Sequence, residues 1–160
     1  MRCVALTLAI FLVSGCSFKG EEFRQRRDAG GWPLRPASMR FHPFTQIKRT
    51  DAGLRIDARI EFSDPAGDVC KGVGELRFEL YAESDSASRQ GSEQRLLQWN
   101  ATITRIEDNS VHWDPVTRTY LFPLTLDSAL PGHPRLQLRA QYDASTGERL
   151  LAQTPIDLPE

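Results

Sequence analysis

Leu54–Phe62 reads LRIDARIEF, and this stretch decides the fold class of the chain. Its apolar side chains stand at every second position, with Arg55, Asp57, Arg59 and Glu61 between them. A period of two places the apolar side chains on one face of an extended strand and the charged ones on the other. The stretch therefore predicts a strand with one face buried in a core and one face toward water.

The same alternation recurs after residue 38, and no segment shows the period of an amphipathic helix. The further alternating runs are Leu76–Ala82, Leu97–Ile103 (with Trp99 expected in the core), Tyr120–Leu126, Leu136–Tyr142 and Leu150–Leu158. One more strand is expected around Met39–Ile47, interrupted by Pro43. The predicted fold is all-β, a seven-strand antiparallel β-sandwich, with immunoglobulin-like and transthyretin-like topologies both open.

Three details of strand pairing follow. The last two strands should form a hairpin, because Asp143, Ser145 and Gly147 supply a turn between them. Pro123 and Pro155 cannot donate a ladder hydrogen bond, so their strands should lie at sheet edges or carry a bulge. If strands 54–62 and 74–82 are antiparallel neighbours, opposite charges match when Glu61 faces Arg77 and Arg59 faces Glu79.

The N-terminus carries a short apolar run. Val4–Val13 is far shorter than the roughly 20 residues that span a bilayer, so it indicates the core of a signal peptide. The run closes on Val13-Ser14-Gly15-Cys16, behind a single basic residue at Arg2, and this resembles the lipobox of bacterial lipoprotein precursors.

The resemblance implies that residues 1–15 are removed and that Cys16 carries a thioether-linked diacylglycerol and a further acyl chain such as palmitate. Two or three acyl chains hold a protein persistently to a membrane. Ser17, a residue other than aspartate after the cysteine, resembles the signal for delivery to the outer membrane. The expected location is the bacterial cell envelope, at the periplasmic face of the outer membrane.

Composition separates a linker from a domain. Residues 16–37 combine the acylated cysteine with charges, glycines and prolines and show no apolar period, which indicates a flexible tether; residues 38–160 form the β-sandwich domain. Without residues 1–15 the chain has 19 Lys and Arg against 21 Asp and Glu, a formal charge of −2, which argues against a nucleic-acid partner. Cys70 then has no intramolecular partner, so the fold must stand without disulfides.

No residue pattern indicates catalysis, a metal or a cofactor. Cys70 lies in the loop DPAGDVCKG without a family signature, so we expect an incidental thiol. Asp64 and Asp68 in the same loop lack the alternating carboxylates of a calcium site and predict a turn. The three histidines, His42, His112 and His133, show no ligand spacing.

The segment Val111–Tyr120, VHWDPVTRTY, is the best candidate for a contact surface. It places Trp113 in a polar turn, and tryptophan and arginine are enriched where binding energy concentrates. His112, Trp113 and Arg118 are therefore the candidate binding residues. The alternative is that Trp113 folds down to cover one open end of the sandwich.

A second resemblance covers most of the domain. The motifs RFHPFT (40–45), GELRFELY (74–81) and HWDPVTRTYLFPL (112–124) are similar to a family of small uncharacterised lipoproteins from planctomycete-type bacteria. The resemblance carries no activity and no functional residue.

We expect a lipid-anchored, non-enzymatic envelope protein whose sandwich binds another protein or an envelope polymer through loops at one end. The first alternative is an assembly or chaperone-like factor that pairs an exposed edge strand with a partner. The second is an enzyme of unknown class, which would need a pocket that gathers His, Asp and Cys70.

Overall fold

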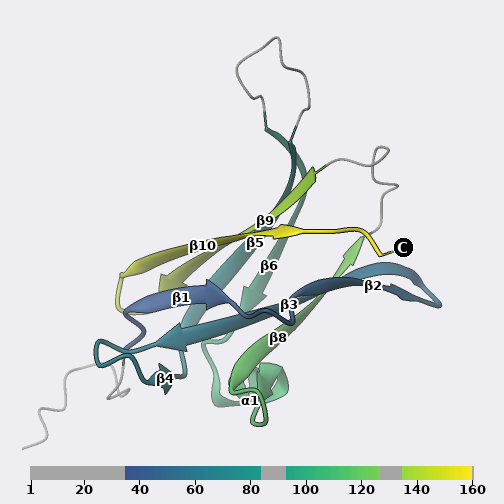
Figure 1. Ribbon diagram of the computed structural model, residues 1–160. Coiled ribbons are helices and arrows are strands. Elements are labelled where there is room, and N and C mark those ends of the chain that lie inside the picture. The colour runs from purple at the N-terminus through teal and green to yellow at the C-terminus, as the bar shows by residue number, and fades with distance from the viewer. Residues whose placement is uncertain (1–34, 84–92, 127–134, 160) are drawn as a thin grey trace, which may run out of the picture.

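The computed structural model describes residues 35–83, 93–126 and 135–159. Within these ranges the chain is an all-β sandwich of two antiparallel sheets with one short helix (Figure 1). The elements are β1 (Ser38–Phe41), β2 (Gln46–Thr50), β3 (Gly53–Ser63), β4 (Val69–Cys70), β5 (Gly74–Glu83), β6 (Gln94–Thr102), α1 (Ile106–His112), β7 (Trp113–Asp114), β8 (Thr119–Leu126), β9 (Arg135–Ala144) and β10 (Arg149–Ile156). In the described part of the chain no helix is both long and apolar enough to cross a membrane.

Several predictions fall elsewhere in the chain. The signal peptide, Cys16 and the tether up to residue 34 lie outside the described residues. So does His133.

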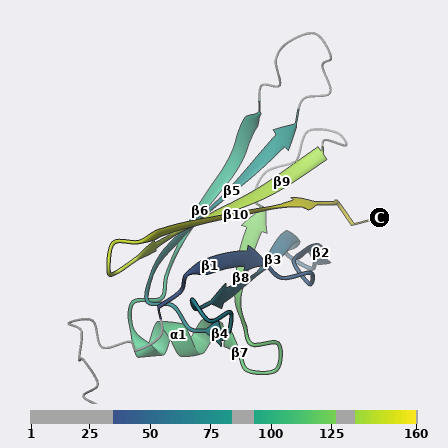
Figure 2. The same cartoon turned by 60° about the vertical axis from the view of Figure 1, so that its left-hand side comes forward.

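The two sheets divide the strands in an immunoglobulin-like way. The first sheet runs β1-β3-β8-β7, with β2 and β4 also paired to β3, and the second runs β10-β9-β5-β6 (Figure 2). Apart from β2 and the two-residue strands β4 and β7, seven strands remain. Of these, β1, β3 and β8 form one sheet, and β10, β9, β5 and β6 form the sheet that faces it. In immunoglobulin lettering these are A, B and E against G, F, C and C′, so the structure selects one of the two topologies that the sequence left open.

The core lies between the sheets and is built from the alternating positions. Ile56, Ala58, Ile60 and Phe62 of β3 are all buried, as the period of two predicts. The largest side chains with essentially no exposure are Tyr120, Tyr142, Phe62, Phe78 and Phe122. Trp99 is half-buried against this core, and its indole Nε1 donates to the Thr125 carbonyl at 3.0 Å, which ties β6 to β8 across the sheets.

The strand count is ten within the described residues, so the prediction of seven was too low. The predicted first strand is split into β1 and β2 around Pro43. The two remaining additions, β4 and β7, are two residues long, and a period cannot be recognised over so short a stretch.

The predicted pairing of strands 54–62 and 74–82 is wrong, because β3 and β5 belong to different sheets. The charges that suggested it have other partners. Glu61 lies opposite Arg40 and accepts from it at 2.8 Å, and Glu79 accepts from Arg95 at 3.0 Å. Charge matching restricts the register of neighbouring strands, but it cannot say which strands are neighbours.

The C-terminal hairpin is confirmed. β9 and β10 pair over their whole length, and Gly147 closes the turn with φ +98°, donating its N–H to the Ala144 carbonyl. Both prolines lie at an edge, as predicted: Pro155 is on the edge strand β10, and Pro123 is on the part of β8 that pairs only with β3. Neither proline interrupts a two-sided ladder.

Candidate functional site

Four segments meet at one end of the sandwich: the β3–β4 turn, the link from β4 to β5, helix α1 and the four-residue turn between β7 and β8 (Figures 1 and 2). This end carries the candidate contact residues His112, Trp113 and Arg118. The β2–β3 turn lies at the opposite end, because β3 runs eleven residues from one end to the other.

Helix α1 was not predicted, because no segment of the sequence shows the period of an amphipathic helix. The helix has seven residues, fewer than two full turns, and its one buried side chain is polar, Asn109. A helix this short with no apolar stripe leaves no periodic signal in the sequence.

Helix α1 is attached to the sandwich mainly by hydrogen bonds of Asn109, and not by a buried apolar face. The Asn109 amide nitrogen donates to the carbonyls of Ile103 at 2.7 Å and Gly72 at 3.2 Å, and its amide oxygen accepts from the Tyr120 hydroxyl. The same hydroxyl accepts from the Gly72 N–H at 3.2 Å. Burial raises the pKa of Tyr120 well above its usual value of 10.0, so the phenol stays protonated and can donate. The network joins the helix to β8 and to the β4–β5 link.

The β7–β8 turn is shaped by Asp114. Its carboxylate accepts from Arg59 at 2.8 Å, from the Thr117 hydroxyl at 2.9 Å and from the Val116 N–H at 3.0 Å. The hydrogen bond from Arg59, followed by those from Thr117 and Val116, lowers the pKa of Asp114 to about 2. Arg118 completes the turn with φ +56°, a left-handed conformation that is uncommon for a residue other than glycine.

Trp113 covers the core and does not stand free in a polar turn. It lies in β7 opposite Tyr120, is half-buried, and meets the Tyr120 ring edge-on with 5.1 Å between ring centroids. Lys71 Nζ lies 4.8 Å from the indole ring centroid. The covering role that the sequence left as the alternative is therefore observed, and a minor part of the side chain still faces solvent beside a cation.

The other two candidate residues differ from each other. The His112 ring stacks at 4.5 Å on Phe122, and its Nδ1 lies 3.1 Å from the Leu121 carbonyl, so it serves mainly to close the end of the core. Arg118 is exposed, and its guanidinium donates to the Val69 carbonyl at 3.2 Å. The structure thus brings Trp113 and Arg118 to one surface and turns His112 inward.

Sequence reasoning missed the exposed aliphatic residues at this end. Ile106 and Val111 of α1 and Val116 of the β7–β8 turn are 79, 80 and 89% exposed. Together with Lys71, Trp113 and Arg118 they are named here the helix-end surface. The available signal was Ile106–Val116, IEDNSVHWDPV, in which apolar residues recur without the period of two found elsewhere.

Cys70 and Asp64, the two loop residues considered for chemistry, lie in β4 and in the turn that precedes it. Cys70 is buried in β4, and burial, then the nearby Asp64 carboxylate, raises the pKa of its thiol, which opposes formation of the reactive thiolate. Asp64 closes the turn that was predicted, since its Oδ1 accepts from the N–H groups of Ala66 and Asp68. Among the described residues no three His, Cys, Asp or Glu side chains gather as metal ligands would.

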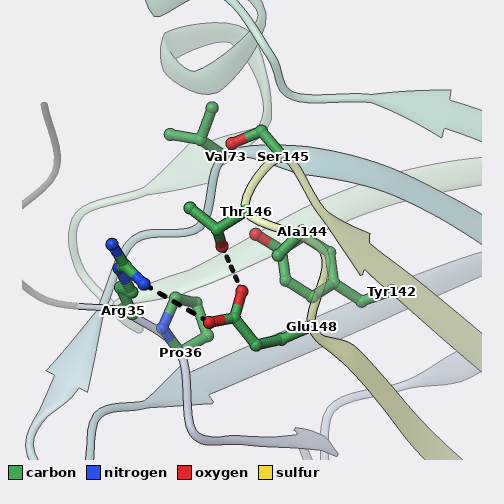
Figure 3. A pocket seen from close by; sticks show the side chains of 8 residues that line it. All are labelled: Arg35, Pro36, Val73, Tyr142, Ala144, Ser145, Thr146 and Glu148. Atoms are coloured by element: carbon green, nitrogen blue, oxygen red, sulfur yellow. Dashed lines mark hydrogen bonds and ion pairs between the residues drawn. The ribbon is translucent and has the colours of Figure 1, made fainter. Parts of the chain in front are cut away.

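A small pocket lies beside the β9–β10 turn, lined by polar and apolar side chains from three parts of the chain, 35–36, 73 and 142–148 (Figure 3). Glu148 accepts from Thr146 and from Arg35, the latter at 3.5 Å. Burial raises the pKa of Tyr142, whose hydroxyl has no hydrogen-bond partner among the described residues, to about 12. The cavity of about 20 Å³ has room for one water molecule, whereas small-molecule sites usually enclose several hundred Å³.

Comparison with known proteins gives no guide to this surface. The chain matches no protein-family model and no curated protein.

Proposed function

We propose that this chain is a lipid-anchored, non-catalytic binding module of the bacterial cell envelope, held at the periplasmic face of the outer membrane, and that it binds another protein through the helix-end surface. The lipobox-like Val13–Cys16 supports the anchor, with Cys16 as the acylated residue. The fold supports the binding role, because sandwich domains commonly present recognition surfaces at one end.

The observation that carries the proposal is the grouping of exposed apolar side chains. Five large apolar side chains are highly exposed in the described residues, and three of them, Ile106, Val111 and Val116, fall within eleven residues at one end. Exposed aliphatic groups that gather on one surface mark interaction sites more often than scattered ones do. A partly exposed tryptophan and two cations at the same end resemble the composition of protein interfaces.

The surface is also held in shape before any partner arrives. The Asn109 hydrogen bonds fix α1, and the Asp114 hydrogen bonds fix the turn that carries Val116. A preformed surface loses little conformational entropy when it binds.

A protein fits this surface better than an envelope polymer does. Sugar polymers are bound through hydrogen bonds to hydroxyl groups and through stacking on aromatic rings. The three highly exposed side chains of this surface are aliphatic and offer neither. An apolar centre with charged residues around it is instead the usual anatomy of a protein interface.

Site-specific photo-crosslinking in cells tests the proposal. A photoreactive residue at Val116 is compared with one at Ala52, an exposed position in the β2–β3 turn at the opposite end. We expect a discrete protein adduct from position 116 and none from position 52. The adduct should weaken at least several-fold with Cys16→Ala, because anchoring supplies the high effective concentration.

Lipidation is measured in the same strains with a clickable palmitate analogue, and Cys16→Ala should abolish the label. Equal adducts from positions 52 and 116, or none from either, would refute the binding surface. A mature protein without acyl label would refute the anchor.

A further inference from the structure

We infer that the partner is a protein of the same membrane that holds the anchor, contacted beside the membrane surface and not across the periplasm. The inference rests on the proposed function, because it takes Cys16 to be acylated and the helix-end surface to be the contact site. Its basis is the place where the chain enters the domain.

The entry point and the helix-end surface lie at the same end of the sandwich. The Ala37 N–H donates to the Ser63 carbonyl at 2.8 Å, and Ser38 pairs with Ser63 at the end of β3. Ser63 also pairs with Val69, so Ser38 and Val69 flank it on either side. Two strand spacings of 4.7–4.9 Å separate them by about 10 Å.

Val69 in turn contacts the helix-end surface. The Val69 carbonyl accepts a hydrogen bond from the Arg118 guanidinium, which belongs to the helix-end surface. The opposite end of β3, with Ala52 in its turn, is eleven residues away, or about 35 Å at roughly 3.3 Å per residue. A chain anchored through its N-terminal side therefore enters the domain at the end that carries the helix-end surface, and the β2–β3 turn is the end farther from that entry point.

The length of the intervening chain sets how far this end can stand from the membrane. Nineteen residue steps separate Cys16 from Arg35. A chain of this length spans at most about 65 Å. The surface can thus reach the headgroups and any protein that projects a short way from them.

The charges around the apolar residues favour a protein over the lipid surface itself. Glu107 and Asp108 lie next to Ile106, while Arg105, Lys71 and Arg118 supply the cations. Docking on an anionic lipid surface is favoured by basic residues of one sign, and the two carboxylates in the first turn of α1 would oppose it. Exposed apolar side chains together with charges of both signs instead suit a protein.

Changing the distance between anchor and domain tests the inference. Photo-crosslinking from Val116 is measured in the full lipoprotein with residues 21–28 deleted, and with a stiff proline-rich segment of 20 residues inserted after residue 28, which adds about 60 Å. A partner in the same membrane predicts that the deletion keeps the protein adduct at its normal yield. The insertion should lower the yield about fivefold or more, because it holds the surface away from the membrane. The control is a flexible Gly/Ser insertion of equal length, which still lets the surface return to the membrane and should cost less than the stiff one.

The opposite trend, with the adduct lost on deletion and retained on stiff insertion, would place the partner across the periplasm and overturn the inference while leaving the binding function intact. Adducts to lipid in place of protein would also overturn it. The acyl label on Cys16 and the protease resistance of the domain are followed for every variant. Absence of any adduct from acylated, folded protein at every tether length would refute the proposed function itself.

Discussion

At the scale of single residues, one polar side chain organises the candidate site. Asn109 replaces the apolar stripe by which short helices are usually held, and it donates to two backbone carbonyls, those of Ile103 and Gly72. Buried polar groups cost most when one partner is removed and the others stay. The network should therefore be sensitive to truncation.

Asn109→Ala leaves the carbonyls of Ile103 and Gly72 and the hydroxyl of Tyr120 without Asn109 as partner. We expect a loss of about 3 kcal/mol in the free energy of unfolding, measured by urea denaturation. The control is Ser110→Ala, which removes an exposed hydroxyl in the next position and should change the free energy by less than about 0.5 kcal/mol. Equal effects of the two substitutions would show that the Asn109 hydrogen bonds do not hold the helix.

The ionised Asp114 carboxylate makes the stability of the fold depend on pH. Its pKa falls from 3.8 to about 2 in the folded chain, so its carboxylate stabilises the fold fully above about pH 4, and that contribution is lost as the pH falls through about 2. Between pH 5 and pH 2, the urea midpoint of the natural chain should therefore fall more steeply than that of Asp114→Asn. Parallel curves would contradict the assignment of the ion pair with Arg59.

Substitutions of Trp113 and Val116 distinguish a role in packing from a role in binding. Trp113→Ala removes a half-buried ring that meets Tyr120, and it should cost about 2 kcal/mol in the free energy of unfolding. Val116→Ser changes a side chain that is 89% exposed, so stability should stay within about 0.5 kcal/mol while crosslinking through a probe at Val111 falls. The contact role of the turn would be refuted if Val116→Ser left the adduct unchanged.

At the scale of elements, the period of two in the sequence was sufficient to predict the long strands. The buried apolar positions of β3 from Ile56 to Phe62 could be predicted, since each is separated from the next by a charged one. The burial of Asp57 and Glu61 on the other face could not. Helix α1 and the sheet partners of β3 could not. Helix α1 is held by side-chain hydrogen bonds to residues distant in sequence, and partner choice depends on how the chain crosses between sheets.

The start of β5 is one place where an element has no spare room. A Cβ added at Gly74 would lie 2.3 Å from the Asp143 carbonyl oxygen and 2.8 Å from the Tyr142 ring. Gly74→Ala should cost about 3 kcal/mol by forcing β5 away from β9, as measured by thermal unfolding. Gly147→Ala is the comparison: it has open space but φ +98°, so only backbone strain of about 1 kcal/mol is expected. A Gly74→Ala protein as stable as the natural chain would contradict the β5–β9 register.

At the scale of the whole molecule, the helix-end surface and the point where the chain enters the domain lie at the same end of the sandwich. The strand alternation and the turn residues are readable from the sequence, and Trp113 and Arg118 could be proposed for a contact surface because of their residue types. Ile106, Val111 and Val116 could not, because exposure depends on what the fold leaves uncovered. Nor could the sequence show that Ser38 enters beside Val69 and therefore beside the helix-end surface.

The most direct test of the central claim compares solvent access of this surface in purified protein and in native membranes by hydroxyl-radical footprinting. Phe44 and Leu151, the other two highly exposed apolar residues, serve as internal references. We predict that oxidation of Ile106, Val111 and Val116 falls several-fold in membranes while Phe44 and Leu151 react equally in both samples. Unchanged oxidation at all five positions would contradict a helix-end contact surface.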